Sequence, residues 1–146
     1  MDEFRPPRPG LRYTPDHLWL RREGGAVVVG VTDRVSRILT LVTSVELPAP
    51  GARLEAGEEL ATIESQKTTV TVQAPCPLEV LEANPELPGD PMLVRLEPYG
   101  RGWLVRVRLA EGAWARLLDE RRYRAAMSGG TGPGGRDGVS DGQEGG

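Results

Sequence analysis

The chain has 146 residues and a net charge of −3, from 18 basic and 21 acidic residues. This length fits a single modest domain. The basic residues form no block interleaved with aromatic ones, which argues against a nucleic-acid partner. No apolar run is long enough to span a membrane, and the first residues lack the apolar segment of a secretory signal.

The chain contains one cysteine and one histidine. A single cysteine cannot form an internal disulfide and favours a reducing, cytoplasmic location. The two residues together are too few ligands for a zinc site of the usual kind, so we expect no metal centre.

The first part of the chain predicts an irregular arm followed by strands. Residues 1–11 are rich in proline and arginine and precede an expected domain over residues 12–127. Leu18–Glu23 and the β-branched run Ala26–Val31 predict two strands, joined by the turn Gly24-Gly25.

A short helix and a third strand are expected next. Thr32 and Asp33 supply a helix-start signal, and the spacing of apolar residues predicts a helix over Asp33–Leu39. Leu41–Leu47 predicts a strand that ends at the proline-rich segment Pro48–Gly51.

The clearest strand pattern lies in the middle of the chain. Thr68–Gln73 alternates valine with polar β-branched residues, and Glu58–Glu64 predicts its antiparallel neighbour. Only Ser65, Gln66 and Lys67 lie between these strands, so Lys67 is expected at the tip of a hairpin.

The last third predicts two more strands and a helix. The strands are Leu78–Glu82 and Trp103–Leu109, separated by a loop that includes Asn84–Asp90, and the helix is Ala113–Met127. The glycine-rich residues 128–146 predict a flexible, disordered tail. The expected fold is a mainly β barrel or sandwich with a helix packed outside it.

Lys67 is the only lysine beside 17 arginines. A GC-rich genome explains why lysine is rare but not why it is kept here, and arginine cannot replace a primary amine as an acyl acceptor. Two interpretations of the position remain open: a covalent attachment site, or an ordinary solvated lysine in a turn.

Several motifs resemble the glycine cleavage H-protein family. Glu64-Ser65-Gln66-Lys67 resembles the Glu-Ser-x-Lys motif of that family. Further matching segments, in the order of the family, are Tyr13–Trp19, Val29–Asp33, Val45–Pro48 and Pro98–Leu104. The resemblance covers about Tyr13 to Met127, which is most of the foldable chain.

This resemblance implies the barrel-sandwich hybrid fold of lipoyl and biotinyl domains, with a short helix in the first third and a C-terminal helix. It also implies that lipoate is bound covalently to Lys67 and that Glu64 and Ser65 help the attachment turn to be recognised. Biotin is disfavoured because the biotinyl motif flanks its lysine with methionine, whereas Gln66 and Thr68 stand here.

The resemblance further implies a non-catalytic carrier that shuttles the aminomethyl group of glycine. Its implied partners are a lipoyl-attaching enzyme, glycine decarboxylase, a folate-dependent aminomethyltransferase and dihydrolipoamide dehydrogenase. A monomer is expected, because a carrier visits several active sites.

The chain departs from the family pattern at several positions. Leu18 and Thr71 replace family acids of the cleft where the cargo amine docks, and Asp16 is placed to compensate. Arg95 replaces an asparagine, and Thr40-Leu41 replaces a glycine-acid pair. Loss of the cleft acids favours one alternative, an H-protein-like lipoate-binding protein of bacterial sulfur oxidation that works with a heterodisulfide-reductase-like complex. A second alternative is an unmodified scaffold or regulatory module. A stand-alone enzyme is disfavoured, because no catalytic constellation is present.

Two further residues carry two interpretations each. His17 is either a cleft residue or a structural hydrogen-bonding group near the first strand. Cys76, between Pro75 and Pro77, is either a redox partner of the lipoyl dithiol or a small residue in a turn.

Overall fold

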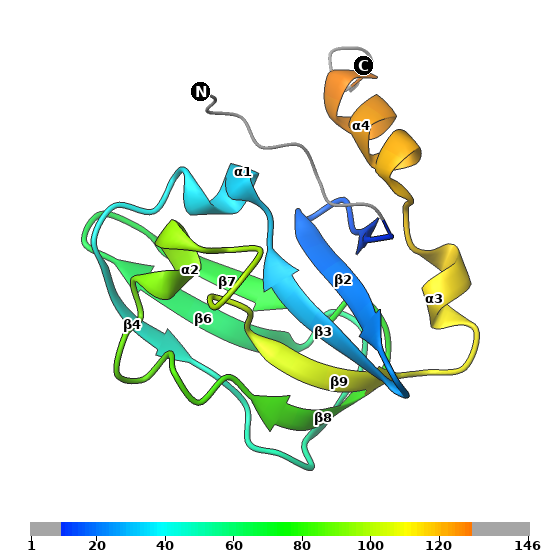
Figure 1. Ribbon diagram of the computed structural model, residues 1–146, viewed down its shortest axis with the longest axis horizontal. Helices are drawn as coiled ribbons and strands as arrows, with labels where there is room; N and C mark the ends of the chain where they lie inside the picture. Colours follow the sequence, from blue (N-terminus) through cyan, green and yellow to red (C-terminus); the bar gives the residue numbers. More distant parts are fainter. Residues whose placement is uncertain (1–9, 130–146) are drawn as a thin grey trace.

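The computed structural model describes residues 10–129, which form two antiparallel sheets and four helices (Figure 1). The six strands of the larger sheet, in spatial order, are β1 (Arg12–Tyr13), β2 (Leu18–Glu23), β3 (Ala26–Val31), β9 (Val105–Leu109), β8 (Leu78–Ala83) and β5 (Arg53–Leu54). The smaller sheet contains β4 (Val42–Glu46), β6 (Glu59–Ser65) and β7 (Thr69–Gln73). The helices are α1 (Asp33–Ser36), α2 (Leu93–Leu96), α3 (Ala113–Arg116) and α4 (Glu120–Gly129).

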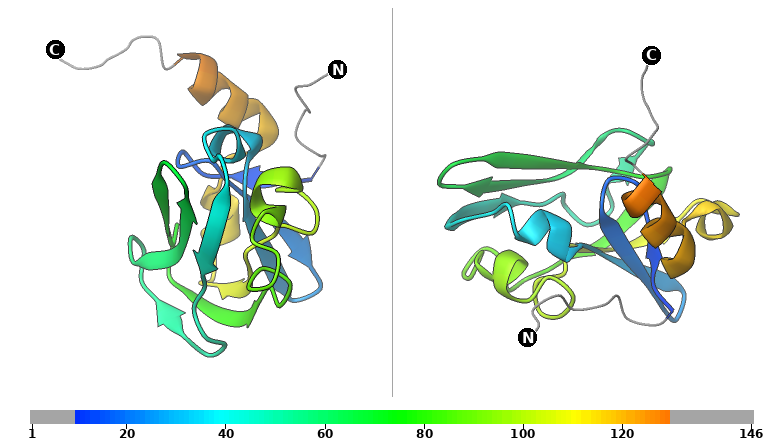
Figure 2. Two further views of the ribbon diagram at one scale, coloured as in Figure 1. Left: turned by 90° about the vertical axis from the view of Figure 1, so that its left-hand side faces the viewer. Right: turned by 90° about the horizontal axis from the view of Figure 1, so that it is seen from above.

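The two sheets pack face to face (Figure 2). Alternate residues of their strands point into the space between them, as the period of two in a strand requires. Leu20, Val29, Ile63 and Val107 are fully buried there in one apolar cluster. This arrangement confirms the predicted fold class, a mainly β barrel-sandwich hybrid with a helix at its C-terminal end.

A second cluster lies on the other face of the larger sheet, where α4 packs. Its buried rings are Tyr13, Trp19, Tyr99 and Tyr123. The Tyr13 and Tyr123 rings stack with their centroids 4.5 Å apart, which ties α4 to β1. Gly30 lies under Trp19, where a Cβ atom would collide with the indole ring.

The prediction of one continuous helix over Ala113–Met127 is wrong. The chain forms α3, leaves the helical conformation at Leu117, and starts again at α4. Between the helices, Leu118 pairs with Tyr13 as a short antiparallel bridge, with backbone N–H to C=O distances of 2.7 and 2.9 Å. Those two hydrogen bonds require an extended backbone at Leu118 and therefore interrupt the helix.

Other boundaries also differ from the predictions. The helix α1 ends at Ser36, three residues before Leu39, and the hydroxyl of Thr32 does not cap it. The sequence patterns did not predict β1, β5 or α2. The helix α4 extends to Gly129, two residues into the predicted tail. The rest of that tail and residues 1–9 of the predicted arm lie outside the described residues.

None of the helices in the described part of the chain is long and apolar enough to cross a membrane.

Candidate functional site

Lys67 lies at the tip of the hairpin between β6 and β7. After an irregularity between Glu59 and Ala61, the strands pair regularly up to Glu64 and Thr69. The turn is closed by Ser65, whose backbone N–H and side-chain hydroxyl both donate to the Thr68 carbonyl, at 2.8 and 3.0 Å. Ser65 therefore fixes the shape of the turn that presents Lys67.

The neighbouring strand β4 holds the tip from the side. The Gln66 N–H donates to the Leu41 carbonyl at 2.9 Å, just before β4 begins. The Thr43 hydroxyl donates to the Glu64 carbonyl at 3.2 Å, and β4 is locally irregular at that point. The hairpin tip is thus tied to a third strand rather than projecting freely.

The Lys67 side chain is exposed, as is Glu64 beside it. No described residue forms a hydrogen bond or ion pair with the Lys67 ammonium. The amine can therefore be approached from solvent, and its acylation would break no contact that stabilises the described part of the fold.

A cleft of about 290 Å³ runs beside β7, on the side that faces the end of β1 and the start of β2. Its lining residues are Pro15, Asp16, His17, Leu18, Val31, Val35, Val70, Thr71, Val72 and Gln73. The cleft thus brings together Asp16, His17, Leu18 and Thr71, the last two being the positions where the resemblance to the family implied acids. Among the described residues that line it, Asp16 has the only carboxylate.

Leu18 and Thr71 differ in their surroundings. Leu18 is 2% exposed and belongs to the core cluster, whereas Thr71 is exposed on β7. Asp16 is also exposed. A carboxylate at Thr71 or Asp16 would remain hydrated, while one at Leu18 would replace a packed core side chain.

His17 lines the cleft and also makes a structural contact. It has a left-handed backbone with φ of 70°, which is uncommon for a residue other than glycine. Its Nδ1 atom hydrogen-bonds the Tyr123 hydroxyl of α4 at 3.0 Å. Burial is the main cause that lowers the pKa of His17, and the Arg34 guanidinium lowers it further, so the neutral ring is favoured.

Sequence reasoning assigned no role to Tyr123. Its hydroxyl lies between His17 and Thr32, 3.4 Å from the hydroxyl of Thr32. The separation of His17 and Tyr123 by 106 positions leaves no local pattern that could have predicted this contact.

Cys76 lies apart from the Lys67 hairpin, in a half-buried turn after β7. It lines another cavity, of about 510 Å³, together with Pro75 and Pro77. Burial raises the pKa of the Cys76 thiol, which disfavours the reactive thiolate.

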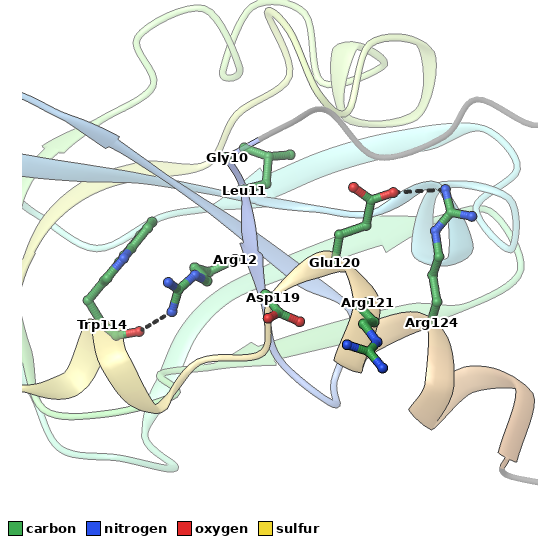
Figure 3. A pocket seen from close by; sticks show the side chains of 8 residues that line it. All are labelled: Gly10, Leu11, Arg12, Trp114, Asp119, Glu120, Arg121 and Arg124. Atoms are coloured by element: carbon green, nitrogen blue, oxygen red, sulfur yellow. Dashed lines mark hydrogen bonds and ion pairs between the residues drawn. The ribbon is translucent and has the colours of Figure 1, made fainter.

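A larger cavity, of about 690 Å³, lies between β1 and the helices α3 and α4 (Figure 3). Within it Arg12 donates to the Trp114 carbonyl at 3.1 Å, and Glu120 pairs with Arg124 at 3.0 Å. These helices lie on the other side of the molecule from the β6–β7 turn (Figure 1). The described residues also contain no cluster of three metal-ligating side chains of the His, Cys, Asp and Glu type.

Comparison with known proteins gives consistent matches. The family model for the glycine cleavage H-protein matches residues 11–129. The glycine cleavage system H protein of Bacteroides thetaiotaomicron is 41% identical over 120 residues, covering 82% of this chain and 95% of the relative. That of Mycobacterium avium is 40% identical over 126 residues, covering 82% and 96%.

A crystal structure of a glycine cleavage system H protein from Mycobacterium marinum has the same fold. It superposes with a TM-score of 0.69 at 33% identity, over 83% of this chain and 98% of that one. The family match and the curated relatives each cover most of the chain. The chain therefore belongs to the glycine cleavage H-protein family.

Proposed function

We propose that Lys67 carries lipoate and that the chain is the non-catalytic carrier component of a glycine cleavage system. The observation that carries this proposal is the position of Lys67, which is exposed and has no hydrogen-bond or ion-pair partner among residues 10–129. It lies at the tip of a hairpin that β4 and Ser65 hold in one shape. It is also the only side chain with a primary amine, because every other basic residue is arginine.

The residues around Lys67 supply a fixed surface for the attaching enzyme. Ser65 sets the turn and Glu64 presents an exposed carboxylate next to it. Lipoate bound there would supply a dithiolane that accepts a group or two electrons by thiol–disulfide exchange. The chain would contribute display and shelter, and the bond-making groups would belong to its partners.

The cleft beside β7 is the place where this chain would shelter the cargo. Thr71 lies four residues after Lys67, and β7 starts at Thr69, so the two Cα atoms are at most about 13 Å apart. An acylated lysine of about a dozen bonds reaches roughly that far. Asp16 would then face the cargo amine. Cys76 lies beyond the end of β7 and lines a different cavity from the cleft beside β7, and burial raises the pKa of its thiol, which disfavours its proposed role as a redox partner of the arm.

The partners that follow from this function are the lipoyl-attaching enzyme, glycine decarboxylase, the folate-dependent aminomethyltransferase and dihydrolipoamide dehydrogenase. The comparisons give no support to sulfur oxidation or to an unmodified scaffold. A cytoplasmic location and a monomeric state remain predictions of the sequence.

Intact mass spectrometry tests the attachment site. The native chain, incubated with a lipoyl-attaching enzyme, ATP and lipoate, should gain the mass of one lipoyl group, and Lys67→Arg should gain none. A control that adds Arg121→Lys to Lys67→Arg offers an exposed lysine elsewhere and should also stay unmodified. An unmodified native chain, or an adduct that survives in Lys67→Arg, would overturn the proposal.

A further inference from the structure

The hydroxyl of Tyr123 lies between two polar side chains. It is 3.0 Å from Nδ1 of His17 and 3.4 Å from the hydroxyl of Thr32. Thr32 is 0% exposed, and the Tyr123 hydroxyl is the only hydrogen-bond partner of its side chain among residues 10–129. The three groups form one hydrogen-bonded row that ends at the cleft beside β7, which His17 lines.

The Thr32 hydroxyl sets the direction of this row. A buried hydroxyl proton needs an acceptor, and the Tyr123 oxygen is the one that the described residues offer. Thr32 therefore donates to Tyr123, and Tyr123 donates its own proton to Nδ1 of His17. Burial and the nearby Arg34 lower the pKa of His17 while Asp16 opposes them, so the ring is neutral at neutral pH. A neutral imidazole that accepts at Nδ1 carries its proton on Nε2.

The Nε2 atom of His17 faces away from Tyr123, because the two ring nitrogens point in different directions. It forms no hydrogen bond with residues 10–129, and it is not one of their buried polar atoms without a partner. His17 lines the cleft and neither of the two cavities near α3. The Nε2–H group is therefore the polar part of His17 that an occupant of the cleft can meet.

Backbone contacts keep His17 in its left-handed conformation. The His17 N–H donates to the Thr14 carbonyl at 3.0 Å, and the His17 carbonyl accepts from the Thr32 N–H at 2.9 Å. Such a backbone in a residue other than glycine persists where the surroundings impose it, and it is typical of functional sites. The ring is thus held by its backbone on one side and by α4 on the other.

We infer that Tyr123 is a positioning residue of the cleft, because its hydroxyl proton occupies Nδ1 of His17 and thereby leaves the ring proton on Nε2. His17 then presents a hydrogen-bond donor to the cargo instead of a base. The inference rests on the proposed function, since it takes the cleft as the place of an amine-bearing cargo.

A base beside such a cargo would shorten its lifetime. An aminomethyl group on sulfur decomposes once its ammonium group has given up a proton. The freed nitrogen lone pair expels the sulfur, which keeps the electron pair of the broken C–S bond and takes up a proton. Water adds to the carbon, and ammonia and formaldehyde leave. With its proton on Nε2, His17 has no lone pair toward the cleft and cannot accept the proton that starts this sequence.

Tyr123→Phe tests the inference, because it removes the hydroxyl and keeps the ring that stacks on Tyr13. His17 is the only histidine of the chain, so 15N-histidine labelling gives NMR signals from this ring alone. Above the pKa of His17, the native chain without lipoate should show a protonated Nε2 and an unprotonated Nδ1. In Tyr123→Phe the two nitrogen shifts should move toward each other, because both tautomers are then populated.

Ammonia release is the second measurement, made on lipoylated carriers that glycine decarboxylase has loaded and that are then isolated. If about one ring in ten carries its proton on Nδ1, a general base that contributes about 100-fold raises the release rate about tenfold. Tyr123→Phe should show this increase. The double variant of Tyr123→Phe with His17→Gln should return to nearly the native rate, which a merely structural role of Tyr123 would not produce.

Tyr99→Phe is the matched control. The Tyr99 hydroxyl belongs to the same aromatic cluster but donates to Asp33, at 3.0 Å, and does not contact His17. This variant should change neither the His17 signals nor the release rate, although it also loses a hydrogen bond of the cluster.

A protonated Nδ1 in the native chain would overturn the inference, as would His17 signals that Tyr123→Phe leaves unchanged. Release from Tyr123→Phe at the native rate, or fast release that survives His17→Gln, would overturn it as well. Failure of the native chain to accept lipoate would instead overturn the proposed function. The NMR measurement needs no lipoate, so the two failures can be told apart.

Discussion

Replacing Asp16 with asparagine should shorten the lifetime of an amine-bearing cargo on the carrier, and replacing Thr71 with aspartate should lengthen it. Both residues line the cleft beside β7, and Asp16 has the only carboxylate among the described residues that line it. A cargo that ends in an ammonium group is held by a carboxylate through charge. The two substitutions change the number of carboxylates in the cleft in opposite directions.

The size of the effect follows from exposure. Asp16 and Thr71 are both exposed, so either substitution should alter the free energy of unfolding by less than about 0.5 kcal/mol. An exposed ion pair contributes about 0.2–1 kcal/mol. The expected change in lifetime is therefore up to about fivefold in each direction, and the double variant Asp16→Asn with Thr71→Asp should return close to the native lifetime.

The assay follows release of ammonia from the lipoylated carrier after glycine decarboxylase has loaded it and has been removed. Thr71→Asn is the matched control, because it has the shape of aspartate without the charge. The difference between Thr71→Asp and Thr71→Asn should shrink at high salt. Equal release rates for these two variants at low salt would refute the role of the cleft carboxylates.

Three further outcomes are expected. Leu18→Glu should lower the free energy of unfolding by at least about 2 kcal/mol in denaturant titration, because Leu18 is a core side chain; a loss below about 0.5 kcal/mol would contradict its burial. Tyr123→Phe should lower the free energy of unfolding by about 1 kcal/mol through loss of the hydrogen bond to His17. In a double-mutant cycle, the same substitution should lower it by less when His17→Gln is already present. Because folding lowers the pKa of His17, the His17 ring binds a proton more readily in the unfolded chain. The contribution of His17 to the free energy of unfolding should therefore be complete above pH 6.5 and fall as the pH drops below it. His17→Gln should remove this pH dependence.

The sequence predicted those elements whose pattern is local. The alternation in Thr68–Gln73 and the β-branched run Ala26–Val31 each became strands with nearly the predicted limits. The segment Ala113–Met127 also has a helical pattern and contains no glycine or proline to interrupt it. It is interrupted by backbone hydrogen bonds between Leu118 and Tyr13. A pairing partner about a hundred residues away cannot be predicted from a short stretch of sequence.

In the candidate site, too, the local features were predicted and the long-range contacts were not. Lys67 was predicted at the tip of a hairpin from the two flanking strands alone. The resemblance to a family drew attention to Leu18 and Thr71 together, but it could not tell that one is core and the other exposed. The contact between His17 and Tyr123 was not predicted, because it depends on how α4 packs across β1.

The fold supports the attachment hairpin and the cleft through separate contacts. The Lys67 turn is held by Ser65 and by the Leu41 carbonyl, within and beside the smaller sheet. The wall of the cleft at His17 is held from α4, through the hydroxyl of Tyr123. A change in α4 can therefore alter how the cargo is sheltered while the hairpin that the attaching enzyme meets keeps its shape. Under the proposed function, attachment and protection of the cargo therefore depend on different contacts of the same small domain.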